Sequence, residues 1–367
     1  MRVVALLFFL LASLAAGADG DSEKSQLASL LSSNSDGFPK ATAARPFSFP
    51  ADHGPHPEYR NEWWYLTGNL DSESGRRFGF ELTIFRFALT PDAPTSVSSW
   101  RTNQVYIAHF AVTDADGERF FVAERFSRGA VGLAGAAADS FRVWIDDWSI
   151  GESGDAWILR AKDEGFGLEL ELVASKAPVL NGVDGLSQKS SEPGNASYYY
   201  SITRLQSDGR LRIGADEFAV SGLSWLDREW SSSALAADQQ GWDWFALQLS
   251  DGSDLMFYNL RKTDGSQDLH SAGTWVTPDG RSRHLETGEV TIRVLEQWQS
   301  PEGGRYPSRW EIAVPEEQLS LTVEPILDDQ ELFTTVRYWE GAVDVAGTYA
   351  ETAITGRGYV ELTGYAE

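Results

Sequence analysis

Three carboxylates lie next to large aromatic residues in the sequence, an environment in which a carboxyl group can act as a catalytic acid. Glu62 directly precedes Trp63, and Asp227 and Glu229 lie within the aromatic segment 225–230. Burial among indole rings raises the pKa of a carboxyl group, because its charged form loses hydration. A carboxyl group kept protonated in this way can protonate an alkene or a leaving group. We therefore select Glu229, Asp227 and Glu62 as candidate catalytic acids.

Asp227 and Glu229 are two residues apart, the spacing that places side chains on one face of a β-strand. Such a pair could act as acid and base, or could hold one arginine between its carboxylates. The alternative for each carboxylate is an ion-pair network with Arg86, Arg228 or Arg261 that fixes a domain interface. The sequence leaves both interpretations open.

Two histidines lie close together, three residues apart, in a segment that contains glycine and proline. His53 and His56 could in principle bind a metal ion together with Asp52 or Glu62. The spacing crosses a loop and not a helix face, so hydrogen bonds that close one end of a barrel are the alternative. We predict no metal site and keep His53 as a candidate ligand-binding residue.

A further histidine, His109, lies in the middle of an apolar strand, between Ile107 and Phe110. An imidazole in such a place is either a core residue with satisfied hydrogen bonds or a proton-transfer group. We include His109 among the candidate catalytic residues.

The chain has 14 tryptophans and 12 tyrosines, and some of them flank the acidic motifs. Two tyrosines on one strand face could gate a pocket with their hydroxyl groups, although most aromatic strands are core. The aromatic residues that we expect to contact a ligand are Trp63, Trp230, Trp242, Trp339, Tyr198 and Tyr200.

Composition excludes several classes of function. The chain has 54 acidic and 30 basic side chains and a formal net charge of −24, which argues against nucleic acid as a partner. It contains no cysteine, which excludes disulfides, thiolate metal sites and a cysteine nucleophile. Residues 222–226 fail the Gly-x-Ser-x-Gly pattern at the last glycine, and no phosphate-binding glycine loop is present. We expect no cofactor.

The first 18 residues have the features of a secretory signal peptide. A basic start precedes an apolar run that ends in small residues before polar sequence, and the run is short for a membrane span. We expect a secreted or periplasmic monomer without a transmembrane segment after cleavage. Residues 19–44 are rich in serine and alanine and are interpreted as a flexible tether.

Short alternating strands with Gly, Asp and Asn turns predict an all-β fold from residue 45 onward. Segments recur in one order along the chain: Trp64 matches Trp244, Trp157 matches Trp310, and Trp225 matches Tyr359. The recurrence predicts two related β-barrels or curved sheets, with domains at 45–230 and 231–367.

Five ordered motifs resemble the AttH/CrtC family of tandem lipocalin-like proteins, which includes carotenoid 1,2-hydratases and predicted secreted hydrolases. They lie at residues 52–65, 225–230, 241–245, 338–341 and 356–365. The resemblance implies two calycin-type antiparallel barrels and a hydrophobic pocket inside or between them. Isoprenoids, polyenes or acyl chains would suit that pocket.

Three functions follow as hypotheses. The first is a protein that binds a hydrophobic lipid or isoprenoid, and the second is an enzyme that hydrates, cyclises or hydrolyses that ligand with a buried carboxylate. The third is a carbohydrate-binding module, because exposed tryptophans on sheets also stack on sugars. Burial of the tryptophans around an apolar cavity would argue against the third, and a desolvated carboxylate with a nearby histidine would favour the second.

Overall fold

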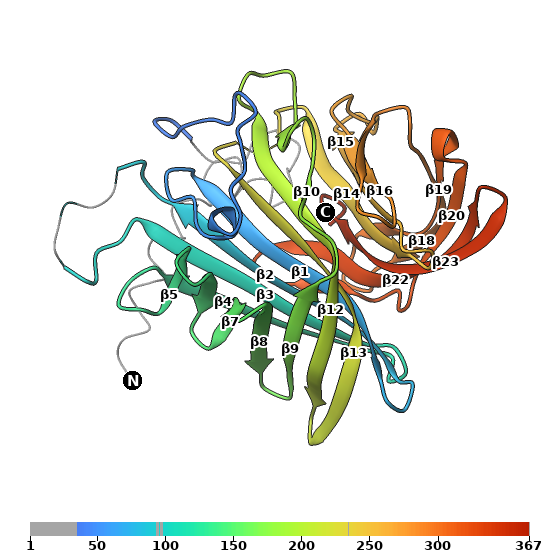
Figure 1. Cartoon of the computed structure of the whole chain (residues 1–367), viewed down its shortest axis with the longest axis horizontal. Helices are drawn as coiled ribbons and strands as arrows, with labels where there is room; N and C mark the ends of the chain where they lie inside the picture. The colour runs from blue at the N-terminus through green and yellow to red at the C-terminus, as the bar shows by residue number, and fades with distance from the viewer. Residues whose placement is uncertain (1–34, 93–94, 96–97, 234, 367) are drawn as a thin grey trace.

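The computed structural model describes residues 35–366, apart from 93–94, 96–97 and 234 (Figure 1). The predicted signal peptide and residues 19–34 of the predicted tether lie outside the described residues. Residues 35–44 form no strand, and within them Ala41 is buried in the core of the first sheet. No helix among the described residues is long and apolar enough to cross a membrane.

The first sheet is antiparallel and follows the order β4-β3-β2-β1-β13-β12-β9-β8-β7-β6-β5, with β10 and β11 paired to β12. It curls so that β5 and β6 contact β3 and β4. A short 3₁₀ helix, η1 (Ala51–His53), precedes it. Its strands are β1 (Asn61–Ser72), β2 (Arg77–Ala88), β3 (Gln104–Asp114), β4 (Arg119–Arg128), β5 (Ala134–Ala137), β6 (Arg142–Ile145), β7 (Trp148–Ser153), β8 (Ala156–Asp163), β9 (Phe166–Ala174), β10 (Val179–Leu180), β11 (Leu186–Gln188), β12 (Ala196–Ile213) and β13 (Asp216–Ser231).

The second sheet is also antiparallel and has the order β17-β16-β15-β14-β23-β22-β20-β19-β18, with β21 paired to β22. In both sheets the first strand therefore pairs with the last one. A second 3₁₀ helix, η2 (Pro315–Glu317), connects β19 to β20. The strands are β14 (Gln239–Leu249), β15 (Asp254–Lys262), β16 (Ala272–Val276), β17 (Ser282–Glu286), β18 (Thr291–Gln299), β19 (Arg305–Val314), β20 (Leu319–Pro325), β21 (Glu331–Phe333), β22 (Arg337–Tyr349) and β23 (Thr352–Leu362).

Each sheet encloses its own apolar core on its concave side. Because side chains alternate along a strand, every second residue of the central strands enters that core and the residues between them face outward. On β1, for example, Trp64 and Leu66 lie in the first core, whereas Tyr65 belongs to a third cluster that also contains Trp244 and Tyr359. The outward faces of both sheets therefore carry apolar side chains as well.

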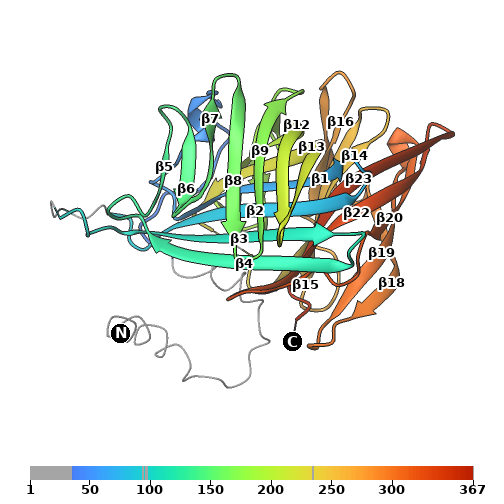
Figure 2. The ribbon, with the colours of Figure 1, turned by 90° about the horizontal axis from the view of Figure 1, so that it is seen from below.

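The two sheets pack against each other through these outward faces, with β1 against β23 and β2 against β22 (Figures 1 and 2). Gly79 allows the close approach, because a Cβ atom added there would lie 2.5 Å from the Cβ of Ala342. An ion pair and a hydrogen bond cross the interface as well. Arg77 pairs with Asp344 at 2.6 Å, and the Asn69 amide donates to the Gly358 carbonyl at 2.9 Å.

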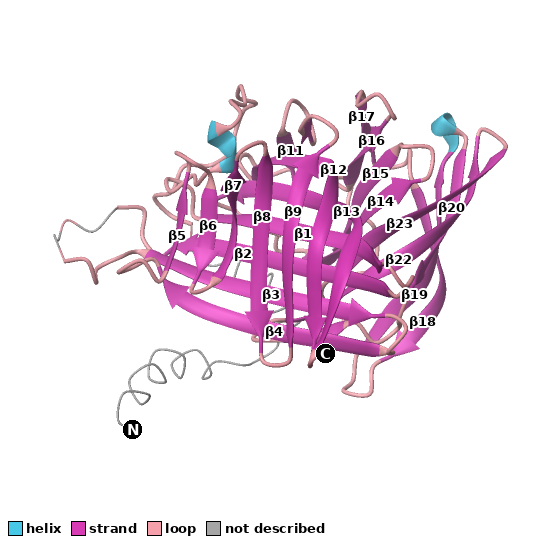
Figure 3. Ribbon diagram, turned by 60° about the horizontal axis from the view of Figure 1, so that its bottom comes forward, coloured by secondary structure: helices cyan, strands magenta, loops and turns pink. Residues whose placement is uncertain are grey.

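The first sheet is nearly a closed barrel and the second is a half-barrel (Figure 3). The prediction of an all-β fold with two tandem lipocalin-like, calycin-type barrels is confirmed at this level. The packing of the sheets leaves a space between their outward faces, and the candidate site lies there.

Candidate functional site

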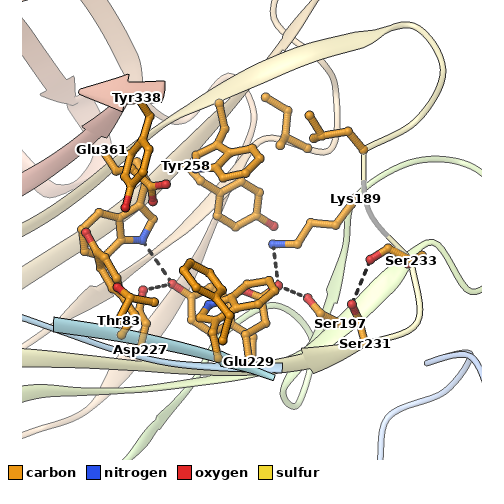
Figure 4. A pocket seen from close by; sticks show the side chains of 18 of the residues that line it. Thr83, Lys189, Ser197, Asp227, Glu229, Ser231, Ser233, Tyr258, Tyr338 and Glu361 are labelled. Carbon is orange, nitrogen blue, oxygen red and sulfur yellow. Dashed lines mark hydrogen bonds and ion pairs between the residues drawn. The ribbon is translucent and has the colours of Figure 1, made fainter. Parts of the chain in front are cut away.

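A pocket with an empty volume of about 910 Å³ lies between the two sheets. Its walls are aromatic and aliphatic, but they include four carboxylates and one lysine (Figure 4). The lining residues that matter for its chemistry are Trp63, Tyr65, Lys189, Ser197, Tyr199, Asp227, Glu229, Trp242, Trp244, Tyr258, Tyr338, Glu340 and Glu361. Pockets with apolar walls and a few placed polar groups are typical of small-molecule sites.

Strand alternation explains which side chains reach the pocket. On β13, Leu226 and Trp230 enter the first core, so Asp227 and Glu229 point outward into the pocket. On β23, Val360 enters the second core and Glu361 points outward.

Glu340 and Glu361 form the acidic end of the pocket. They are paired positions on β22 and β23. Tyr338 lies two residues before Glu340, on the same face of β22 (Figure 4). Burial raises the pKa of Glu361 to about 8, and the nearby Asp227 and Glu229 carboxylates add to the shift. Burial also raises the pKa of Glu340 well above its ordinary value. Both groups are thus held in the protonated form at neutral pH.

Glu340 has a special environment even among these acids. Among the described residues, neither of its oxygens makes a hydrogen bond of ordinary geometry. The hydroxyl groups of Tyr65 and Tyr338 nevertheless lie close enough to favour its charged form. Burial opposes its ionisation most, and the neighbouring carboxyl groups of Glu81 and Glu361 oppose it further, so Glu340 keeps its proton.

Asp227 differs from these glutamates because it accepts several hydrogen bonds. Trp225 Nε1 donates to its Oδ1 at 2.7 Å, Ser201 Oγ donates at 2.5 Å, and the hydroxyl of Tyr199 donates to its Oδ2. Burial raises the pKa of Asp227 to about 6, and these donors limit the rise. Asp227 is therefore mainly ionised at neutral pH.

Lys189 and Glu229 form the opposite end of the pocket (Figure 4). Their Nζ and Oε1 atoms are 3.3 Å apart, the ammonium group lies 4.0 Å from the ring centre of Tyr258, and Ser197 donates to Glu229. Burial opposes the charge on Lys189, but Glu229 and Tyr258 carry its pKa above the ordinary value. This end of the pocket therefore holds a charged donor.

The pocket combines a protonated acid with an ionised carboxylate at neutral pH. Glu361 can donate a proton, and Asp227 can accept one. Pairs of carboxyl groups whose environments separate their pKa values are the usual arrangement for general acid–base catalysis. The aromatic walls can bind an apolar ligand between them.

Of the residues selected from the sequence, Asp227, Glu229, Trp63 and Trp242 line the pocket. The predicted shared face of Asp227 and Glu229 is confirmed, since both point into the same space. Their roles as catalytic residues, and those of the other selected residues, stay predictions.

Tyr198 and Tyr200 lie on the other side of β12, in the core of the first sheet. The tyrosine between them, Tyr199, lines the pocket instead. The sequence indicated that Tyr198 and Tyr200 share a face, which is correct, but it contained no signal for which face meets the second sheet.

Trp230 and Trp339 are buried in the cores of the first and second sheets, respectively. Trp230 stacks on the imidazole of His56 at 3.7 Å between ring centres. The indole of Trp339 donates to the Asp328 carbonyl at 2.7 Å. Neither ring reaches the pocket, so the structure gives both a packing role.

Glu62 lies in a buried ion-pair network. Its carboxylate binds the guanidinium groups of Arg86 and Arg228, and the His56 amide donates to it at 3.0 Å. Burial opposes the charge on Glu62, but the two arginines hold its pKa well below the ordinary value. The raised pKa expected from its aromatic neighbours is therefore wrong, and the alternative of an ion-pair network with Arg86 and Arg228 is what the structure shows.

The two histidines of the 53–56 loop have separate partners. His53 Nδ1 lies 2.6 Å from the Tyr200 hydroxyl, and His56 Nε2 lies 3.0 Å from Asp52. Burial lowers the pKa of His53 to about 4. These contacts fit the hydrogen-bonded loop that was the alternative to a metal site.

His109 lies on the outward face of β3 and is almost completely buried. Its Nδ1 atom lies 2.7 Å from the Tyr338 hydroxyl, and its Nε2 atom lies 3.1 Å from Glu124. It does not line the pocket itself but contacts a tyrosine that does. The imidazole faces the second sheet and not the core of the first, which its neighbours Ala108 and Phe110 enter.

Several residues of the site were missed in the sequence, namely Lys189, Tyr199, Tyr338, Glu340 and Glu361. Tyr338, Glu340 and Glu361 belong to motifs that carried the family resemblance, so a signal was present. Lys189 lies between β11 and β12 in a polar loop that resembles any surface segment.

Fold and site together define a tandem lipocalin-like protein with a pocket of aromatic and acidic side chains between its two sheets. Residues 40–365 match the model of the AttH-like family, and the chain belongs to this family. No curated protein matches the chain.

Solved structures show the same fold. An AttH protein from Nitrosomonas europaea is 32% identical and has a TM-score of 0.81, over 90% of this chain and 100% of its own. Kievitone hydratase from Nectria haematococca is 13% identical with a TM-score of 0.66, over 95% and 99% of the two chains. CghA, solved with Sch210972, is 14% identical with a TM-score of 0.52, over 89% and 95%. The fold is thus related to that of a hydratase.

Proposed function

We propose that this protein binds an unsaturated hydrophobic small molecule between its two sheets and catalyses acid-assisted addition of water to it. The observation that carries the proposal is the pairing of a proton-holding glutamate, Glu361, with the ionised Asp227 in one aromatic pocket. A carrier needs only apolar walls, whereas this pocket holds three buried carboxylates and one partly buried one at the expense of their hydration. An isoprenoid or another polyene would fit the aromatic walls.

In the proposed reaction Glu361 gives its proton to one carbon of the double bond, and the π electrons form the new C–H bond. Water then forms a C–O bond to the other carbon, and Asp227 takes the proton that water releases. The net change is the addition of one water molecule. The aromatic rings of Trp63, Trp242 and Trp244 can stabilise the cationic carbon between the two steps, because ring faces attract positive charge.

The position of the tryptophans argues against a sugar-binding surface. Of the 14 tryptophans, all of which are among the described residues, Trp100 alone is exposed, at 65%. The others are buried or partly buried. A sheet face with several exposed rings, as stacking on a sugar chain would need, is not formed by the described residues.

We also propose that the protein is exported and acts as a monomer. The apolar N-terminal run supports export to the periplasm or the medium, and the net charge of −24 supports a soluble monomer whose partner is the small molecule. Fusion of residues 1–40 to a reporter enzyme tests export, because a reporter that stays inside the cell would contradict it.

Binding can be tested by the quenching of tryptophan emission with cis-parinaric acid, a fluorescent polyene. We expect Trp242→Phe, which changes the pocket wall, to reduce the quenching, and Trp339→Phe, which changes the second core, to leave the affinity unchanged. Equal quenching in wild type and Trp242→Phe would contradict binding in this pocket.

Catalysis can be tested with geraniol, linalool and farnesol in D₂O. We expect deuterium on carbon, or a product heavier by one D₂O, and we expect Glu361→Gln to lose this activity while it still binds cis-parinaric acid. Glu217→Gln, on an exposed part of β13, is the matched control. Deuterium incorporation that persists in Glu361→Gln would remove this residue as the acid.

A further inference from the structure

A chain of hydrogen bonds leads from the pocket to the protein surface. Tyr338 lines the pocket and lies beside Glu340, its hydroxyl is 2.7 Å from His109 Nδ1, and His109 Nε2 is 3.1 Å from Glu124 Oε1. Glu124 lies on β4, and its side chain is 17% exposed, whereas that of His109 is 1% exposed. The chain therefore crosses from buried to solvated groups within three side chains.

The outer end of the chain opens into a surface groove. Glu124 lines this groove together with Phe120, Val122, Asp329 and Phe333. Its carboxylate also accepts hydrogen bonds from the backbone amide of Thr335 at 3.0 and 3.1 Å and from the Thr335 hydroxyl at 3.0 Å. These bonds fix the carboxylate against His109 while one side remains in contact with solvent.

The described contacts of His109 come from three strands. Glu124 faces it from β4, Tyr338 from β22, and the ring of Phe85 from β2 at 5.7 Å. The imidazole thus has one partner toward the pocket and one toward solvent. Such an arrangement suits a group that passes protons, because each ring nitrogen can bind or release one.

We propose that Tyr338, His109 and Glu124 form a proton relay that restores the acid end of the pocket from solvent. The inference rests on the proposed function, since a buried acid that has given up its proton must recover it. Solvent protonates Glu124, which passes the proton to Nε2 of His109. Nδ1 then gives its proton to the Tyr338 oxygen, and the Tyr338 proton moves to Glu340 as Glu340 gives its own proton to the Glu361 carboxylate on the neighbouring strand. One proton moves inward, and no electrons are transferred.

The relay has a test that needs no substrate. Protonated buried carboxyl groups give an infrared C=O band that shifts on deuteration. The loss of a band in Glu340→Gln or Glu361→Gln assigns that band to the substituted residue. After rapid mixing into D₂O, we expect the shift to be slower by roughly tenfold or more in His109→Gln, Tyr338→Phe and Glu124→Gln than in wild type. Asp329→Asn, in the same groove but outside the chain, should exchange like wild type.

Glu124→Gln and Tyr338→Phe keep the test valid if the buried His109→Gln variant folds poorly. Exchange at the wild-type rate in both would overturn the relay, because protons would then reach the acids through the pocket mouth. If exchange depends on these residues but no alkene gains deuterium, the relay stands and the proposed reaction fails. If the alkene gains deuterium but the variants exchange at the wild-type rate, the proposed reaction stands and the relay fails.

Discussion

Glu340 and Glu361 lie directly opposite each other on the neighbouring strands β22 and β23, with Glu340 buried and Glu361 partly buried between the sheets. Like charges at paired positions of a sheet repel each other, and burial adds the cost of lost hydration. The pair is compatible with the fold only because its carboxyl groups keep protons. This arrangement makes stability, and the rate of the proposed reaction, depend on pH.

We expect the melting temperature to fall as pH rises from 5 to 8. The pKa of Glu361 is raised from 4.5 to about 8 by folding, so the folded state binds more protons than the unfolded state between these values. The stabilisation is complete below the unfolded pKa and is lost as pH rises through the folded one. The double variant Glu340→Gln/Glu361→Gln should show a flatter profile by calorimetry, and a profile as steep as wild type would contradict the assignment.

The rate of the proposed reaction should have a bell-shaped pH profile. Asp227, with a pKa of about 6, must be ionised to accept a proton, so the rate rises through that pH. Glu361, with a pKa of about 8, must be protonated, so the rate falls above it. Deuterium incorporation into alkenes across pH 4–10 measures both limbs. A rate that falls steadily from pH 5 would instead point to Asp227 as the acid.

Tyr199→Phe should raise the pKa of Asp227. The tyrosine hydroxyl donates to Asp227, and this hydrogen bond favours the ionised form. Its loss should shift the acidic limb of the rate profile, and the infrared titration of the Asp227 carboxyl, to higher pH. Tyr198→Phe, on the opposite face of the same strand, serves as the control and should leave that titration unchanged.

Glu62→Gln should destabilise the protein by about 3–5 kcal/mol, because it leaves the buried guanidinium groups of Arg86 and Arg228 without their anion. Urea unfolding measures the loss, and Glu58→Gln, at an exposed position, is the control. We expect binding of cis-parinaric acid to persist in folded Glu62→Gln. A stable variant that has lost only catalysis would instead support a catalytic Glu62.

The repeat found in the sequence corresponds to strands with the same place in the two sheets. Trp64 and Trp244 lie on β1 and β14, each of which pairs with the last strand of its sheet. Their side chains nevertheless face opposite ways, since Trp64 enters the first core and Trp244 lines the pocket. A shift of one residue reverses the face of every side chain in a strand. A match between two tryptophans in the sequence therefore could not show which sheet face each side chain occupies.

The sequence alone determined the strand periodicity, the family, the two-barrel architecture and the shared face of Asp227 and Glu229. Local alternation and ordered motifs carry this information. Only the tertiary structure decided that Tyr199 and not Tyr198 lines the pocket, and that Glu361 lines the same pocket as Asp227. It also decided that Arg86 and Arg228 neutralise Glu62. These facts depend on which sheet faces pack together, and a carboxylate's pKa depends on neighbours that are distant in the chain.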